Sequence, residues 1–229
     1  MVRSPSAGPV NSAGFSLIEL LVGLASGLFV VAAAIGLLTS HLQENRALVV
    51  ETRLMQELRS AADRITRDLR RAGYWGDATA AVWQPDSASR VNPYLALAPT
   101  AAASNSASFR YSRDPTENQA VDLNEEFGYR LRNGNIEVLL GGSWQTLTDS
   151  GTLVVTAFNV SPQVNEQPLE QLCSRPCPTE PAGDCPPRLQ VRRLDLQISA
   201  RSAVDSRVVR TLQSSVRLRN DALTGACAD

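Results

Sequence analysis

The chain has 229 residues, with 22 basic and 23 acidic side chains and a formal net charge of -1. This length allows one ordinary domain, or one domain and a separate long element, and the balanced charge gives no global field that would attract nucleic acid. His41 is the only histidine, and the sequence has no nucleophile elbow, P-loop or metal-ligand cluster. We therefore expect no enzyme, no cofactor and no metal.

The first predicted element is an apolar helix over residues 15–38. These 24 residues carry one charge, that of Glu19, and contain no proline. At about 1.5 Å per residue, the segment can cross a hydrocarbon core of about 30 Å. A secretory signal peptide has a shorter apolar region that precedes its small-residue cleavage site, whereas Ala13 and Gly14 come before this one. The sequence therefore predicts a membrane helix that is retained.

Glu19 is the residue of this segment that needs an explanation. A carboxylate in a membrane helix costs up to roughly 2.5–3.5 kcal/mol, so a cation should neutralise it. A cut between Gly14 and Phe15 would create an α-amino group one helical turn away, on the same chain or on a neighbour. The alternative is a simple membrane anchor whose Glu19 reaches the lipid headgroups.

The string GFSLIEL at residues 14–20 resembles the class III signal of type IV prepilins and type II secretion pseudopilins. The resemblance implies that residues 1–14 are a leader peptide, removed after Gly14 by a prepilin peptidase. It also implies N-methylation of Phe15 and a role for Glu19 in recruiting the next subunit during assembly.

Small residues recur within the apolar segment. Gly23 and Gly27 form a G-x-x-x-G pair, and Ala32 with Gly36 forms a second small-xxx-small pair. These spacings let helices approach closely, although small residues are also common in membrane helices without a specific contact.

After Leu38 the helical pattern becomes amphipathic, without a breaker. Gly73 follows Arg70 and Arg71, which predicts a helix end with a C-cap glycine. Apolar residues at spacings of three and four form one face: Ala47, Val50, Leu54, Leu58, Ala61, Ile65, Leu69 and Ala72. The opposite face is predicted to be solvated, with an Asp63–Arg67 ion pair, and comprises Glu51, Arg53, Glu57, Asp63, Arg67, Asp68 and Arg71.

A helix over residues 15–72 would be about 87 Å long at about 1.5 Å per residue, which exceeds the room in an ordinary domain. We therefore expect residues 15–38 to lie in lipid or against other subunits. Residues 39–73 are expected to dock on a head through the apolar stripe.

From residue 74 onward the periodicity shifts to two, which predicts a β-rich head over residues 74–229. Asn133-Gly134 predicts a type I′ hairpin turn, and residues 84–106 predict a connecting loop. Tyr74 and Trp75 are expected to cap the core of the head. Strands are predicted near residues 109–111, 127–131, 136–140, 153–160, 189–200 and 208–219. The expected fold class is α+β and type IV pilin-like, with a long N-terminal helix packed on an antiparallel β-sheet.

The proline-rich stretch 162–187 is predicted to be an irregular surface insertion. It contains Cys173, Cys177 and Cys185, and Cys227 lies near the end of the chain. The even number of cysteines favours two disulfides in an oxidising compartment, with three possible pairings. A four-thiolate zinc site is the alternative, but the spacing lacks C-x2-C pairs.

Two further strings resemble PilW-type minor pilins: RDLRRAGYWG at 67–76, as their helix end, and VRLRN at 216–220, as their closing strand. The resemblance implies a minor pilin that primes or supports type IV pilus assembly and thereby motility. It implies an inner-membrane protein of a Gram-negative bacterium, with a single span and a periplasmic head, that later joins the pilus. The implied partners are the prepilin peptidase, other minor pilins, the major pilin, membrane lipid and the pilus assembly machinery.

Two alternatives remain open. A GspJ-like minor pseudopilin of type II secretion shares the leader and a similar helix end. A tip adhesin or DNA-binding module is the alternative of another class, although a solvated sheet face is the commoner reason for arginines that alternate along strands. The arginines that would serve it are Arg192, Arg193, Arg201, Arg207, Arg210, Arg217 and Arg219.

Overall fold

The computed structural model describes residues 14, 16–81, 91–178 and 185–227. Residues 1–13 of the expected leader and Phe15 lie outside this description, as do parts of the predicted loop and insertion. The chain divides into two compact units, one up to Val49 and one from Val50 onward.

Helix α1 (Leu17–Leu69) contributes residues to both units. In the first unit, every side chain from residue 17 to residue 49 is exposed. The large apolar side chains between Leu17 and Leu38 are 55–77% exposed. By length and composition α1 can cross a membrane, since its most apolar window has a mean hydropathy of 2.5. This exposure is what the expected lipid or subunit contacts require.

In the second unit, α1 buries the predicted apolar stripe. Leu54, Leu58, Ile65 and Leu69 are each 0% exposed. Burying one such side chain contributes about 1.5–3 kcal/mol, so these residues hold the helix on the head. The predicted stripe begins too early, because Ala47 is exposed and Val50 is only half-buried; Ala61 and Ala72 are buried as predicted.

The helix ends as its sequence predicts, with a tightened last turn. Ala72 N donates to Leu69 O at 3.1 Å, a bond to the residue three positions earlier. Gly73 then adopts a φ of +75°, the left-handed conformation expected of a C-cap glycine. Its N–H donates to Arg110 O at 2.8 Å, so the chain leaves α1 bonded to the first sheet.

The charged face of this helix segment is solvated only in part: its arginines and Asp63 are exposed as predicted, but its other acids are half-buried. Three of its acids bond to the head instead: Glu51 accepts from Arg210 Nε at 3.0 Å, Glu57 from Asp149 N at 3.2 Å and Asp68 from Tyr129 Oη at 2.6 Å. The predicted Asp63–Arg67 pair is absent from the ion pairs that the described residues form. Helix periodicity identified the face, but it could not show which acids have a partner across the domain.

The first sheet is antiparallel, in the order β1-β2-β3-β4-β5. Its strands are β1 (Leu97–Ala98), β2 (Ser106–Arg110), β3 (Glu126–Arg132), β4 (Asn135–Leu140) and β5 (Ser143–Thr146). The predicted hairpin turn is confirmed, since β3 and β4 pair up to Arg132 and Asn135, and Asn133 and Gly134 have φ values of +49° and +75°. Short 3-10 helices η1 (Ala78–Ala81) and η2 (Leu123–Glu125) lie in the connections.

The second sheet has the order β6-β7-β8, and β9 also pairs with β7. Its strands are β6 (Leu153–Pro168), β7 (Arg188–Ser202), β8 (Val209–Arg217) and β9 (Ala222–Thr224). The predicted insertion is wrong over residues 162–168, because these extend β6 and pair with residues 188–194. Proline is tolerated there because β6 is an edge strand, whose outward N–H groups need no partner. The connection to β7 contains η3 (Glu170–Leu172).

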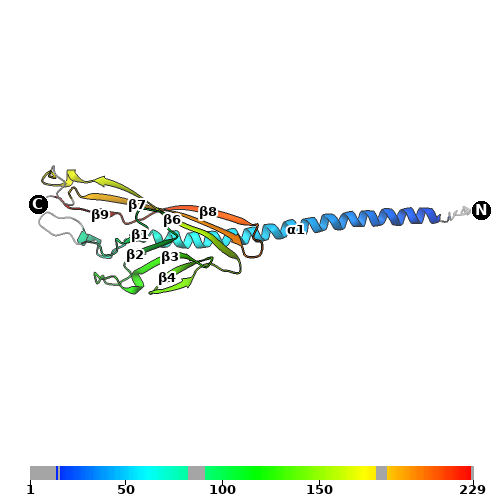
Figure 1. The fold of residues 1–229 in the computed structure, drawn as a ribbon, viewed down its shortest axis with the longest axis horizontal. Helices are drawn as coiled ribbons and strands as arrows, with labels where there is room; N and C mark the ends of the chain where they lie inside the picture. Colours follow the sequence, from blue (N-terminus) through cyan, green and yellow to red (C-terminus); the bar gives the residue numbers. More distant parts are fainter. Residues whose placement is uncertain (1–13, 15, 82–90, 179–184, 228–229) are drawn as a thin grey trace, which may run out of the picture. The chain divides into compact units, whose positions relative to one another are not determined.

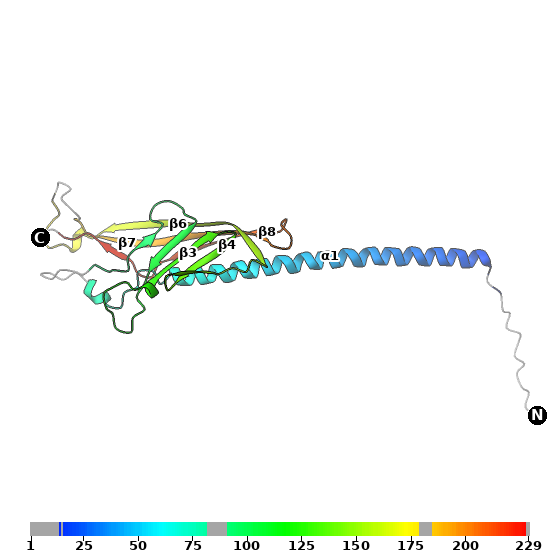
Figure 2. The ribbon, with the colours of Figure 1, turned by 60° about the horizontal axis from the view of Figure 1, so that its bottom comes forward.

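Helix and sheets share one core, which confirms the α+β class, although the strands form two sheets rather than one. Figure 1 shows β6, β7 and β8 running beside the second part of α1, and Figure 2 shows β3 and β4 beside the same part. Four aromatic rings stack along β2 and β3, with centroids 4.1–6.3 Å apart: Phe109, Tyr111, Phe127 and Tyr129. Trp75 is buried as expected, whereas Tyr74 is half-exposed.

Candidate functional site

The N-terminal turn of α1 carries Glu19, the acid singled out in the sequence. Ser16 N donates to Glu19 Oε2 at 3.4 Å, so the carboxylate is turned back toward the helix N-terminus. The positive end of the helix dipole favours a negative charge there. Gly14 is described, but Phe15 is not, so the expected cleavage and methylation site lies outside the described residues.

The small residues of the apolar segment leave open patches on the helix surface. A Cβ added at Gly23, Gly27 or Gly36 would meet no atom within 4 Å. Two hydroxyl groups here bond to the helix backbone: Ser26 Oγ donates to Val22 O at 2.7 Å, and Thr39 Oγ1, just beyond the apolar segment, donates to Gly36 O at 2.8 Å. The glycines therefore allow another helix to approach closely.

The carboxyl end of α1 is held by residues from distant parts of the head, which we call the helix-end clasp: Asn92, Arg192, Arg219 and Asn220. Arg219 N donates to Arg70 O at 3.2 Å, and Asn220 Nδ2 donates to Ala72 O at 3.2 Å. Asn92 Nδ2 donates to Gly73 O at 2.9 Å. These bonds satisfy carbonyl groups that a helix end leaves without an internal partner.

Arg192 fixes the clasp from the β7 side. Its Nη2 donates to Asn220 O at 3.1 Å and its Nη1 to Leu95 O at 2.9 Å. The side chain is only 6% exposed, and burial lowers the pKa of its guanidinium, partly offset by the charge of Asp221. The two PilW-like strings are therefore in contact, because residues of the tail string (216–220) donate hydrogen bonds to carbonyl groups of the helix-end string (67–76).

Two disulfides close the far end of the second sheet. Cys173 pairs with Cys227, and Cys177 pairs with Cys185. No thiol is left free among the described residues, so the zinc alternative is wrong for this structure. The first disulfide ties the C-terminal segment to the β6–β7 connection, which is one of the pairings that the sequence left open.

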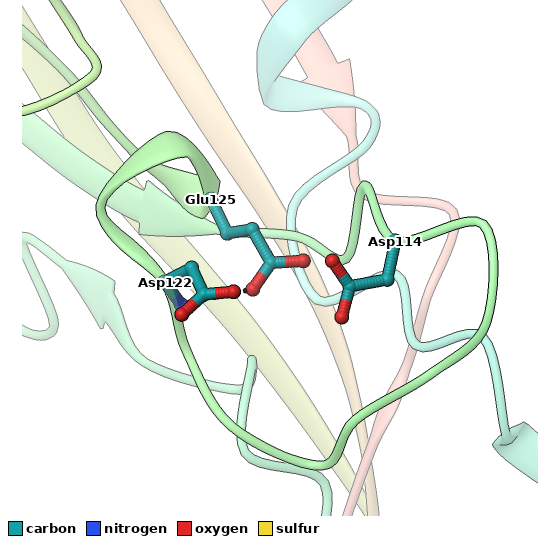
Figure 3. A group of neighbouring side chains, drawn as sticks. All are labelled: Asp114, Asp122 and Glu125. Carbon is teal, nitrogen blue, oxygen red and sulfur yellow. Dashed lines mark hydrogen bonds between the residues drawn. The ribbon is translucent and has the colours of Figure 1, made fainter.

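A cluster of carboxylates lies in the connection between β2 and β3. Oxygens of Asp114, Asp122 and Glu125 all lie within 4.8 Å of one another, and these are the described acids that could hold a divalent cation. Figure 3 shows Asp114 and Asp122 on opposite sides of Glu125. Glu125 is completely buried and accepts from Arg113 N at 2.7 Å and Asp122 N at 3.0 Å. Its bonds thus anchor this connection.

Tyr94 links the cluster to the loop before β1. Its hydroxyl lies 3.0 Å from Glu117 Oε1 and 3.2 Å from Glu125 Oε2. Burial and the neighbouring carboxylates raise the pKa of Tyr94 far above its usual value, so the group is a neutral donor. Burial and the charge of Glu125 raise the pKa of Asp114, which shows that negative charge is crowded here.

Four of the seven arginines considered for DNA binding are engaged within the second unit. Arg192 is buried in the clasp, and Arg207 and Arg217 pair with Asp205 and Asp221 at 2.8 and 3.1 Å. Arg210 pairs with Glu51. Alternation does expose Arg193 and Arg217 together, at paired positions of β7 and β8, but it could not show that Arg192 and Arg210 bond to other elements.

The fold and these features define a pilin-like protein: an exposed apolar helix with an acid in its first turn and a β-rich head docked on its second half. The sequence profile described as prepilin peptidase-dependent protein B, PpdB, matches residues 47–218. The chain belongs to this family and is a type IV pilus-related protein. No curated protein and no solved structure matches it.

The clasp includes residues that sequence reasoning missed. Asn220 carried a signal, because it ends the tail string, but its bond to Ala72 spans 148 positions of the chain. Asn92 carried no signal, and Arg192 was assigned to an exposed face. The structure brings the four cysteines together at one end of the second sheet, whereas Glu19, Gly23 and Gly27 belong to the first unit.

Proposed function

We propose that this protein is a minor pilin of the PilW type that primes or supports the assembly of a type IV pilus. One observation carries the proposal: Glu19 lies in the first turn of an exposed apolar helix, and none of the ion pairs between described residues involves it. An unpaired acid in lipid needs a cation. Membership of a prepilin peptidase-dependent family supports the idea that this cation is the α-amino group created by cleavage.

In this proposal, a prepilin peptidase removes residues 1–14 and leaves a methylated, positively charged amine at Phe15. Ser16 N, the neighbouring backbone group, already lies 3.4 Å from Glu19 Oε2. A cation at position 15 is therefore within reach of a carboxylate of its own chain or of an adjacent subunit. Subunits that stack in lipid would neutralise both charges at once, which favours recruitment of the next subunit.

The remaining parts receive roles that follow from this one. Residues 15–38 anchor the protein in the inner membrane as a single span, and Gly23 and Gly27 let another subunit's helix approach. Residues 39–73, the second part of the helix, connect this anchor to a periplasmic head over 74–229. The partners are the prepilin peptidase, other minor pilins, the major pilin and the assembly machinery, and the protein has a structural rather than an enzymatic role.

A GspJ-like minor pseudopilin remains a second candidate, because the family's description names only dependence on the peptidase and fits both systems. The neighbouring genes separate the two. Genes for a pilus motor and a major pilin support the pilin assignment, whereas genes for a type II secretion channel support the pseudopilin.

The proposal is tested by mass spectrometry of the N-terminus and by a neutral substitution. Protein from its native membrane should begin at methylated Phe15. Glu19→Gln should leave cleavage intact but reduce co-purification with other pilins and the number of surface filaments. Glu44→Gln is the matched control, since Glu44 is exposed on the same helix beyond the apolar segment. Full assembly of Glu19→Gln, or a chain that retains its leader in assembled filaments, would refute the proposal.

A further inference from the structure

The solvent-facing side of the head's helix segment carries an unusual concentration of positive charge. Residues 50–72 contain six arginines and four acids. All six arginine side chains are exposed. We call them the arginine stripe: Arg53, Arg59, Arg64, Arg67, Arg70 and Arg71.

The acids of this segment offset the charge of the stripe only in part, and three of them bond to the head. Glu51, Glu57 and Asp68 accept hydrogen bonds from Arg210, Asp149 and Tyr129, respectively. Only Asp63 remains exposed. Among the described residues only Glu51 is paired with a cation, Arg210, so six arginines and the three remaining acids leave a net charge of +3 on this helix segment.

The stripe forms no ion pairs with the head among the described residues, although Arg71 lies over the ring of Tyr111, 4.9 Å from its centroid. Arg67 has like charges three and four residues away, at Arg64, Arg70 and Arg71, and such pairs destabilise a helix. The helix dipole favours cations only near the last turn, so it does not account for Arg53, Arg59 and Arg64.

We propose that the arginine stripe is a docking surface for a carboxylate-rich face of another protein subunit in the same assembly. This inference rests on the proposed function and names the chemistry of one partner. From Arg53 to Arg71 the stripe extends over about 27 Å at about 1.5 Å per residue, a length suited to contact along another helix. Acids at matching positions of the partner supply the missing counter-charges and relieve the repulsion within the stripe.

Nucleic acid is the less favoured ligand for two reasons. The whole chain carries a net charge of -1, so no long-range attraction guides a polyanion to it. The head also carries the crowded carboxylates of Asp114, Glu117 and Asp122, which repel an extended polyanion. The acidic face of a protein subunit can be small enough to contact the stripe without reaching these carboxylates.

The full chain in phosphatidylcholine nanodiscs is titrated with a fluorescent helical peptide that carries glutamates along one face, and separately with a short DNA duplex. Arg53→Glu/Arg59→Glu/Arg67→Glu reverses the stripe. The matched control is Arg132→Glu/Arg175→Glu/Arg193→Glu, since these arginines are exposed and form none of the ion pairs between described residues. Both variants change the charge by the same amount.

We expect the stripe variant to bind the peptide at least about tenfold more weakly and the control to stay within about twofold. Wild-type binding should weaken as salt rises from about 50 to about 200 mM. Equal losses in the two variants overturn the proposal. The proposal is also overturned if the stripe variant loses affinity for the DNA duplex but not for the peptide.

A crosslinking experiment in cells identifies the docked face. With Ser60→p-benzoylphenylalanine in the middle of the stripe, light should crosslink the chain to an acidic segment of another pilin-like subunit. Arg53→Glu/Arg59→Glu/Arg67→Glu should abolish the crosslink, and reversing the acids of that segment to arginine should restore it. A crosslink that persists after stripe reversal overturns the proposal. Because Glu19 is unchanged in these variants, failure here leaves the Glu19 test of the proposed function intact.

Discussion

Removing the two disulfides separately should destabilise the head by different amounts. Cys173 and Cys227 are 54 positions apart, whereas Cys177 and Cys185 are 8 apart. A disulfide stabilises mainly by restricting the unfolded chain, and the effect grows with loop length. The entropy of loop closure gives about 4 kcal/mol for the long loop and about 2.5 kcal/mol for the short one.

The folded state should survive the loss of the long-range disulfide. The C-terminal segment is also held by β9, in which Ala222 and Thr224 pair with Gln190 and Arg188 of β7. The loss of Cys173–Cys227 therefore acts chiefly on the unfolded chain, for which the loop-length argument holds. We expect Cys173→Ser/Cys227→Ser to lower the free energy of unfolding by about 1.7 kcal/mol more than Cys177→Ser/Cys185→Ser.

Urea unfolding of the full chain in detergent, followed by tryptophan fluorescence, measures this difference. All three tryptophans follow residue 72, and Trp75 is only 3% exposed, so the signal reports on the head. With a denaturant slope of about 2 kcal/mol/M, the two midpoints should differ by about 0.8 M. Equal midpoints, or a larger loss for the short loop, would refute the loop-entropy reasoning.

Two further predictions concern the helix end and the carboxylate cluster. Gly73→Ala should lower the urea midpoint more than Gly141→Ala. Both positions have a positive φ, which costs an alanine about 1–2 kcal/mol, but only the new Cβ at Gly73 would lie 3.0 Å from Arg192 Nη2. Equal losses would argue against the clasp. Asp114→Asn should raise the urea midpoint at about pH 7, because the raised pKa of Asp114 means that its ionised form destabilises the folded state. The gain should vanish below about pH 3, where the acid is protonated in both the folded and the unfolded state. A gain that persists in acid would contradict the charge crowding.

Local sequence signals were enough to predict the helix, its end and one hairpin. The three- and four-residue spacing around Leu54 and Leu58 is set by the helix itself, so burial of that face follows once any core is available. Asn133-Gly134 likewise favours a type I′ turn through its own backbone preferences. These features needed no knowledge of the rest of the fold.

The features that could not be predicted from the sequence depend on contacts between residues far apart in the chain. Residues 162–168 read as irregular because of their prolines, but pairing with β7 at a sheet edge makes them a strand. Glu57 and Asp68 were predicted to be solvated, but Asp149 of the β5–β6 connection and Tyr129 of β3 donate hydrogen bonds to them. Glu19 was identified as the one charge in the apolar segment, whereas Gly14 and Phe15 were identified by resemblance, and the roles of all three stay predictions.

The contrast between the two units suggests where assembly can change the structure. Four aliphatic side chains that are 0% exposed, Leu54, Leu58, Ile65 and Leu69, bind the second part of α1 to the head. At about 1.5–3 kcal/mol each, and with the helix-end clasp added, separating this part would cost most of a domain's stability. Residues 17–49 are exposed throughout and have no comparable anchor. We therefore expect any rearrangement of the helix during assembly to fall before residue 50, while the head and its arginine stripe move as one body.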